Sequence, residues 1–436
     1  MRERVDSALI IISPKITADY SKMAVYNKSQ YILNFGYLTL TTQTSIYKNP
    51  ARREYILTAE ERAEYRRISQ DSRLSKLAAQ NGLHEKIHPV NTPRFNPNSL
   101  MPQIAPNGLK TLSLFSGGGG LDLGFDKAGY EHIASYELIP VCTETLSLNR
   151  PNWSVYGGSK LGDVTQVDWN KFADKIDVIH GGPPCQPFSI AGEQKGAEDE
   201  RNMWGEFNRA VNTIKPKAFV AENVLGLLSP KFEDFVKLHI LDKLSDYSIA
   251  RFEMHASDFG VPQVRRRVFF VGFLNKKHLK KFVVPEPTHT WAYLNRESSS
   301  SIFDAFLPKT PGVREALGLP NIGFDNLAPT IRSGFTGKRN TTSVLNSSAG
   351  QKSWGDMKIW PNGVQSDREK ASAFPPQNEH FRLSVQDVGL IQGFPESWQF
   401  SGAAYQVLGQ IGNSVSPPVA YNVAKNVMEA LKSTPI

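Results

Sequence analysis

One stretch reads Thr111-Leu-Ser-Leu-Phe115-Ser-Gly-Gly-Gly-Gly120-Leu121, an apolar run followed by four glycines and the start of a helical pattern. The apolar run predicts a strand at about residues 111–115, and the pattern after the glycines predicts a helix at about 121–127. Glycines between a strand and a helix let the backbone approach a nucleotide-like ligand without obstruction by side chains. A tight turn without a ligand would also use glycine, so the loop must be interpreted with its surroundings.

The alternation of strand and helix patterns continues on the carboxyl side of this loop. It predicts an α/β fold with a parallel sheet, in which the carboxyl ends of the strands meet at one edge. Loops at that edge are expected to hold a ligand. The further predicted strands lie at about 132–137, 177–180, 218–222 and 268–273, and the further predicted helices at about 141–148, 203–214 and 232–244.

Chemically useful side chains follow these predicted strands. Glu137 ends the second strand, where folds of this kind place a carboxylate that accepts hydrogen bonds from ribose hydroxyls. The segment Gly181-Gly-Pro-Pro-Cys185-Gln-Pro-Phe-Ser189 follows the third, and its three prolines impose a rigid path on the chain around the cysteine. Glu222 ends the fourth strand, so the sequence predicts that the Cys185 thiol and this carboxylate meet at one edge of the sheet.

Each of these side chains also has an ordinary structural explanation. A free cysteine is most often a buried small apolar residue, as we expect for Cys142 in its helical pattern. Glu222 could cap a helix. Arg265 and Arg267, two residues apart before a predicted strand, are expected to project from one face and to serve a phosphate or a base, or to lie solvated.

Composition limits the class of protein. The formal charge of +8 and the pI of about 9.2 favour a polyanionic partner. No window approaches the ~18 continuous apolar residues of a membrane span, so we expect a soluble, cytoplasmic protein. The two cysteines exclude a disulfide framework and a cysteine-based zinc site, and we expect no metal.

Changes of texture along the chain predict four segments. Residues 1–108 lack the strand-helix rhythm and form an accessory extension, in which Thr58-Ala-Glu-Glu61 resembles a capping box that opens a charged helix reaching about residue 80. The alternation of strand and helix patterns occupies residues 109–285. Residues 286–380 are rich in Ser, Pro, Asn, Gly and Thr, and predict a smaller irregular domain; residues 381–436 return to the first domain.

Taken in order, these motifs resemble those of the cytosine-5 DNA methyltransferase family. The resemblance runs from the glycine loop through Pro184-Cys185-Gln186, Glu222-Asn-Val224 and Gln263-Val-Arg-Arg-Arg267. It continues in Arg382-Leu-Ser384, Gln392-Gly-Phe-Pro395 and Gly412-Asn-Ser-Val415, and covers residues 109–285 and 381–436. The family often has Asp-Leu-Phe-Ala-Gly where this chain has Ser113-Leu-Phe-Ser-Gly117.

The resemblance implies a Rossmann-like, S-adenosylmethionine-dependent methyltransferase domain with a smaller target-recognition domain. It implies that Glu137 holds the ribose of S-adenosylmethionine, that Asp163 receives its adenine amino group and that Trp204 is an apolar pocket residue. The other residues implied to line this pocket are Phe115, Gly117, Gly119, Gly120, Leu121, Asn413 and Ser414. Expected contacts with double-stranded DNA are Gln186, Ser189, Arg332, Lys338, Arg339, Thr341 and Thr342.

The family's chemistry then implies the catalytic roles. Cys185 adds as a thiolate to C6 of a cytosine flipped out of the duplex, and Glu222 donates a proton or hydrogen bond at N3. Arg267 holds the cytosine O2, and Arg265 and Arg267 lower the pKa of the thiol. Methylation of C5 follows, in a monomer that acts near the nucleoid of a prokaryote, either with a restriction endonuclease encoded nearby or as an orphan enzyme.

Three other functions remain open at this point. A catalytically silent DNA-binding relative would lack a working set of Cys185, Glu222 and Arg267, whereas this chain has all three. An RNA-directed member of the family would carry a Cys-Phe-Thr segment, which this chain lacks. A nucleotide-binding oxidoreductase sharing only the glycine loop would give the Pro-Cys-Gln segment no purpose.

Overall fold

The computed structural model describes residues 59, 60, 63, 70, 74, 89–184, 202–291, 306–333, 342–345, 347–373 and 380–432. Contacts divide the chain into one unit of residues 15–85 and another of residues 1–14 and 86–436. The five described residues between 59 and 74 are helical, within the helix predicted there. In the part of the chain described, no helix is long and apolar enough to cross a membrane.

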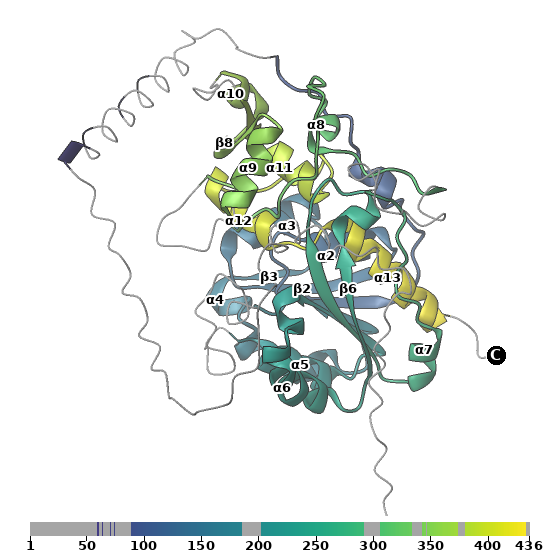
Figure 1. The fold of residues 1–436 in the computed structure, drawn as a ribbon. Coiled ribbons are helices and arrows are strands. Elements are labelled where there is room, and N and C mark those ends of the chain that lie inside the picture. The colour runs from purple at the N-terminus through teal and green to yellow at the C-terminus, as the bar shows by residue number, and fades with distance from the viewer. Residues whose placement is uncertain are drawn as a thin grey trace, which may run out of the picture. The chain divides into compact units, whose positions relative to one another are not determined.

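The larger unit is built on a seven-stranded sheet with the order β3-β2-β1-β4-β5-β7-β6 (Figure 1). The strands β1 to β5 run parallel to one another. The sheet order reverses at β1, which lies between β2 and β4, and a crevice forms at such a point outside the carboxyl ends of the strands. The strands are β1 (Lys110–Leu114), β2 (Glu131–Glu137), β3 (Val155–Gly157), β4 (Val178–Gly181), β5 (Ala218–Val224), β6 (Ser248–His255) and β7 (Arg266–Phe273).

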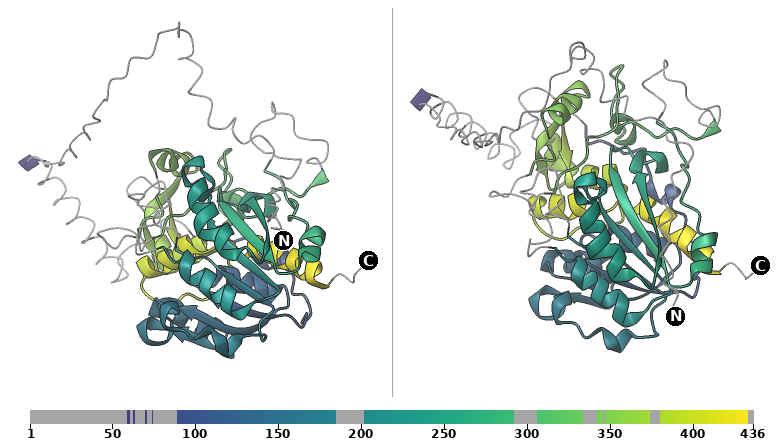
Figure 2. Two further views of the ribbon diagram at one scale, coloured as in Figure 1. Left: turned by 90° about the horizontal axis from the view of Figure 1, so that it is seen from below. Right: turned by 60° about the horizontal axis from the view of Figure 1, so that its bottom comes forward.

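Apolar residues on both faces of the sheet explain why helices cover it on both sides. Val220 and Val271 pack on one face with α2, α3 and α13, and Phe219 and Phe270 pack on the other face with α5 and α6. The C-terminal helix α13, in yellow in Figure 2, packs against α2 in this layer. These helices are α2 (Gly120–Lys127), α3 (Pro140–Asn149), α5 (Trp204–Ile214), α6 (Glu233–Val236) and α13 (Pro417–Lys432).

The structure differs from the predicted strands and helices in three respects. It is mixed, because β7 runs antiparallel to both β5 and β6. The strands β3 and β6 were not predicted: β3 is only three residues long, and β6 is interrupted by charged residues on its less buried face. The helix predicted at 232–244 is broken into α6, a π-helical turn (Lys237–Leu241) and a 3-10 turn (Asp242–Leu244).

A second, smaller core lies in the segment predicted to be irregular. It joins residues from Val313 to Val364 with residues from Phe381 to Ile411. Parallel pairing of β8 with β9 links the two parts of the chain. Residues 381–432 therefore contribute to both cores, whereas the sequence assigned them to the first alone. The elements of this region are α8 (Val313–Ala316), α9 (Ser348–Asp356), β8 (Ile359–Gln365), α10 (Arg368–Ala373), β9 (Phe381–Ser384), α11 (Val385–Gln392) and α12 (Ala404–Asn413).

The basic helix α7 (Lys276–Lys281) belongs to the sheet and not to this smaller core. It packs against β6, β7 and α13. Leu279 buries its side chain there, while four lysines flank it in the sequence. The strand-helix part of the chain therefore includes α7, which was not among the predicted helices.

Candidate active site

The glycine loop lies at the carboxyl end of β1, where the sheet order reverses. Phe115 leaves the strand with a φ of 56°, a left-handed conformation that costs a non-glycine residue about 1–2 kcal/mol. Gly117 and Gly119 also have positive φ values, of 54° and 84°. A Cβ added at Gly117 would meet no atom within 4 Å, so the loop presents open backbone at this point. Strained backbone of this kind concentrates at ligand-binding sites.

Glu137 lies directly beside this loop at the end of β2. Its carboxylate accepts hydrogen bonds from the backbone N–H groups of Gly117, at 2.7 Å, and Ile139, at 2.8 Å. Burial raises the pKa of the carboxyl although these hydrogen bonds act in the opposite direction. A carboxylate has about four acceptor sites, so two remain for hydroxyl donors. The predicted neighbours Gly117 and Glu137 are therefore in contact.

The segment after β3 brings Asp163 to the same strand end. A Cβ at Gly162 would lie 2.1 Å from the carbonyl oxygen of Glu137, so only glycine permits this approach. Asp163 begins a 3-10 turn and accepts hydrogen bonds from the backbone N–H and the hydroxyl of Thr165, at 3.0 and 2.8 Å. Leu138 follows Glu137 directly, and Leu161 lies two residues before Asp163. Both leucines expose more than half of their surface. Acceptors and apolar surface together suit a nucleoside.

The C-terminal segment lies against the glycine loop through Ser414 and Val415. A Cβ at Gly120 would lie 2.1 Å from the carbonyl oxygen of Val415, and one at Gly118 would lie 3.0 Å from the Ser414 Oγ. The Ser414 hydroxyl donates to the Gln410 carbonyl oxygen at 2.8 Å. Asn413 is exposed at the end of α12. No role was predicted for Val415, whose backbone makes the closest of these approaches.

Glu222 and Arg267 form an ion pair at the carboxyl end of β5. The Arg267 Nε lies 2.8 Å from the Glu222 Oε1, and both side chains are largely buried. Burial raises the pKa of the Glu222 carboxyl, whereas Arg267 and then Arg265 lower it. Since β7 is antiparallel to β5, its first residues lie at this edge, and Arg267 pairs with Val224 across the two strands. An all-parallel sheet would have placed Arg267 at the opposite edge.

Arg265 has a different environment from Arg267. It is 2% exposed, and its Nη2 donates to the carbonyl oxygens of Gly412, at 2.9 Å, and Ser414, at 2.6 Å. These contacts tie the start of β7 to the segment that closes on the glycine loop. The charge of Arg265 also lowers the pKa of the Glu222 carboxyl.

The loop predicted to carry the nucleophile starts beside Glu222. A Cβ at Gly182 would lie 3.2 Å from the Glu222 Oε2, and the Asn223 side chain donates to the Pro183 carbonyl oxygen at 3.1 Å. Asn223 stood in the motif, but its anchoring role was not predicted. Cys185, Gln186 and Ser189 lie outside the described residues. Cys142 is buried in α3, where burial raises the pKa of its thiol.

The remaining predicted residues lie farther out or deeper in the fold. Trp204 has no exposed surface and packs edge-on against Phe207 and Phe270. Phe115 packs against the same apolar cluster, and Leu121 is buried in the first turn of α2. Arg332 is exposed, and its backbone packs on Gly412. The carbonyl oxygen of Thr342 accepts a hydrogen bond from the backbone N–H of Val364. Lys338, Arg339 and Thr341 lie outside the described residues.

A buried carboxyl under the glycine loop predicts a pH effect on stability. Burial raises the pKa of Asp122, in the first turn of α2, from 3.8 to about 6, although Ser113 and Ser135 act in the opposite direction. Its ionised form is therefore disfavoured in the folded protein. The free energy of unfolding should fall as the pH rises from about 4 to 6, by up to about 3 kcal/mol, and should stay low above that range.

Asp122→Asn should abolish this loss, because an amide does not ionise in this range. Urea unfolding at pH 5 and pH 8 measures it: the variant should gain stability relative to the wild type at the higher pH. Asp234→Asn, at an exposed position on α6, is the matched control and should leave the pH dependence unchanged. An Asp122→Asn protein with the wild-type pH dependence would contradict the assignment.

The strand order of the sheet, the glycine loop after β1 and Glu137 at the end of β2 together define a Rossmann-like methyltransferase domain. A family model for C-5 cytosine-specific DNA methylase matches residues 109–429. The chain is 34% identical to the type II methyltransferase M.NgoMIV of Neisseria gonorrhoeae over 331 residues, which cover 74% of this chain and 98% of the relative. It is 32% identical to the type II methyltransferase M.NaeI of Lentzea aerocolonigenes, over 74% of this chain and 75% of the relative.

Among solved structures, an Escherichia coli prophage protein described as a DNA modification methyltransferase is 26% identical, with a TM-score of 0.49. The match covers 74% of this chain and 100% of that one. The chain belongs to the C-5 cytosine-specific DNA methylase family. It is accordingly an enzyme, a DNA (cytosine-5) methyltransferase, and the resemblance inferred from the motifs is confirmed.

Proposed function

We propose that the protein transfers a methyl group from S-adenosylmethionine to C5 of a cytosine in a specific double-stranded DNA sequence, with Cys185 as nucleophile. The observation that carries this proposal is the buried Glu222–Arg267 pair at the base of the Gly182–Pro183 segment. Cys185 follows Pro183 by two positions, so the chain spans at most ~7 Å between their Cα atoms. This distance supports a thiol and a carboxyl acting on the same base.

The residues at the carboxyl ends of β1 and β2 fit S-adenosylmethionine. The spare acceptor sites of Glu137 suit ribose hydroxyls, and Asp163 suits an adenine amino group. The open backbone at Gly117 suits a ligand that lies close to the chain. Phe115, Gly119, Gly120, Leu121, Trp204, Asn413 and Ser414 would complete the pocket. When bound, S-adenosylmethionine supplies an electrophilic methyl group on a sulfonium centre.

The protein's own residues would make cytosine reactive toward that group. C5 of cytosine is a poor nucleophile; addition of the Cys185 thiolate to C6 forms a C6–S bond, breaks the C5=C6 double bond and leaves a C4=C5 enamine whose C5 is nucleophilic. Glu222 donates its proton, or a hydrogen bond, to N3 as negative charge enters the ring. Its raised pKa favours the protonated form that this role requires. Arg267 holds the O2 atom, and loss of the C5 proton with departure of Cys185 completes the cycle.

Access to C5 and C6 requires the cytosine to leave the stacked duplex, at a cost of a few kcal/mol. We assign the DNA contacts that offset this cost to residues 286–380, which form part of the smaller core and its loops. Arg332 is exposed beside the site, and Thr342 lies at β8. With Lys338, Arg339, Thr341, Gln186 and Ser189, these residues are the proposed phosphate and base contacts.

The relatives are type II methyltransferases. We therefore propose a restriction-modification setting with a cognate endonuclease, and action as a monomer in the cytoplasm at the nucleoid. The catalytic domain would be residues 109–285 with 381–436, and residues 1–108 an accessory extension.

Incubation with labelled S-adenosylmethionine and mixed-sequence duplex DNA tests the proposal. Label should appear in 5-methylcytosine, and methylation-sensitive sequencing of the product should show one short recognition sequence. A duplex with 5-fluorocytosine in that sequence should form a complex that survives denaturation, because fluorine cannot leave C5 as the proton does. Transfer to RNA instead of DNA would assign the RNA-directed activity. DNA binding without any transfer would identify a catalytically silent relative.

A further inference from the structure

Trp398 connects the C-terminal segment to the glycine loop. It lies between α11 and α12 and is 5% exposed. Its indole Nε1–H donates a hydrogen bond to the Gly118 carbonyl oxygen at 3.1 Å, across 280 residues of chain. The donor therefore fixes the peptide at the middle of the four glycines, in the loop that the proposed function assigns to S-adenosylmethionine.

The ring of Trp398 also fills the space beside the next glycine. A Cβ at Gly119 would lie 2.6 Å from the Trp398 Cζ2 and 2.8 Å from the Leu146 Cδ2. Gly119 is the N-cap of α2 and has a φ of 84°. The indole thus meets the loop through one polar contact at Gly118 and one apolar contact at Gly119, and a loop that moved would lose both.

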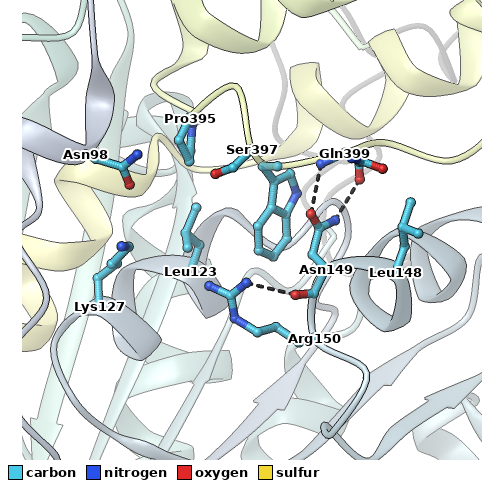
Figure 3. A pocket seen from close by; sticks show the side chains of 10 residues that line it. Asn98, Leu123, Lys127, Leu148, Asn149, Arg150, Pro395, Ser397 and Gln399 are labelled. Atoms are coloured by element: carbon cyan, nitrogen blue, oxygen red, sulfur yellow. Dashed lines mark hydrogen bonds between the residues drawn. The ribbon is translucent and has the colours of Figure 1, made fainter.

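Trp398 is itself held by the end of α3. The Arg150 guanidinium lies 5.4 Å from the centre of its ring, and Asp126 fixes that guanidinium through an ion pair at 2.7 Å. Asn149 and Gln399 exchange two hydrogen bonds, in which the Gln399 N–H donates to the Asn149 Oδ1 at 2.8 Å and the Asn149 Nδ2 donates to the Gln399 carbonyl oxygen at 2.7 Å (Figure 3). Gln399, the residue after Trp398, is therefore held against the end of α3.

A pocket of about 220 Å³ lies beside these contacts, with Leu123 and Lys127 of α2 on its wall (Figure 3). Trp398 is thus held both by the contacts from the end of α3 and by packing in the apolar core, where the centre of its ring lies 6.1 Å from that of Phe394. We propose that Trp398 is a positioning residue, which holds the glycine loop in the shape that binds the cofactor and does not itself take part in the reaction.

Trp398→Phe tests this inference, because it removes the donor and keeps an aromatic ring. Trp153→Phe is the matched control, since Trp153 also faces Arg150, at 5.7 Å, and stacks on His132 of β2 and not on the glycine loop in the part of the chain described. Calorimetry with S-adenosylhomocysteine should show binding about five- to tenfold weaker for Trp398→Phe, the loss expected for one hydrogen bond. With saturating S-adenosylmethionine, kcat should change less than about twofold, so that the effect appears in KM.

Amide hydrogen exchange of residues 116–121 in the cofactor-free protein gives an independent measurement. Exchange should be faster in Trp398→Phe and unchanged in Trp153→Phe. If the fold of Trp398→Phe is compromised in a melting experiment, 3-benzothienylalanine at position 398 replaces it, because this residue keeps the ring size and lacks the N–H. Wild-type affinity and wild-type exchange in the benzothienylalanine protein would overturn the inference.

The two measurements separate this inference from the proposed function. A wild-type protein that fails to bind S-adenosylhomocysteine would refute the proposed cofactor. The exchange of the loop amides would still report whether Trp398 positions them.

Discussion

Cys185→Ala is expected to reduce methyl transfer by at least about 10⁴-fold, the scale of loss when a covalent nucleophile is removed. The physical reason is that addition of a thiolate to C6 makes C5 nucleophilic, and the other of the chain's two cysteines, Cys142, is buried in α3. Initial rates with labelled S-adenosylmethionine and duplex DNA measure the loss. DNA binding by the same protein should remain, because phosphate contacts supply most of the affinity.

Cys142→Ala is the matched control for this substitution. Cys142 is buried in α3 and burial raises the pKa of its thiol, so it is not expected to react. Its replacement should leave the rate within about threefold of the wild type, since it affects packing alone. The assignment of the nucleophile fails if Cys185→Ala retains substantial activity, or if the two variants lose activity equally.

Glu222→Gln is expected to lower kcat by about 10²–10⁴-fold, the range for removal of a positioned general acid. Glutamine keeps the shape of the side chain but has no acidic proton for N3. It also removes the negative partner of Arg267, whose Nε lies 2.8 Å from the carboxylate. The affinity for DNA should be little changed, because Glu222 is buried at the sheet edge.

The matched control is Glu233→Gln, which breaks an ion pair with Arg251 on the same unit, at 3.1 Å. Glu233 is exposed, so this variant should keep wild-type kinetics. The raised pKa of Glu222 also predicts a pH profile: kcat should fall as the pH rises through that pKa, because the proton donor is lost. A kcat that kept its wild-type value and pH dependence in Glu222→Gln would refute the proposed proton donor.

The amino-acid sequence by itself determined the family, and it predicted which groups carry the chemistry. Each motif is local: the glycines before α2, Glu137 at a strand end and the prolines around Cys185 have meanings that depend on neighbouring residues alone. Apolar periodicity likewise predicted β1, β2, β4, β5 and β7, because strands buried on both faces leave continuous apolar runs.

Only the tertiary structure decided how distant segments meet. The direction of β7 places Arg267 against Glu222, and no local pattern states whether a strand runs parallel or antiparallel to its neighbour. Trp398 reaches Gly118 across 280 residues, and Arg265 binds the Gly412 and Ser414 carbonyl oxygens. Such contacts depend on the packing of whole helices and strands, which buries apolar area without regard to separation along the chain. For this reason the sequence could predict the reacting groups, whereas only the fold could decide which distant side chains lie beside them.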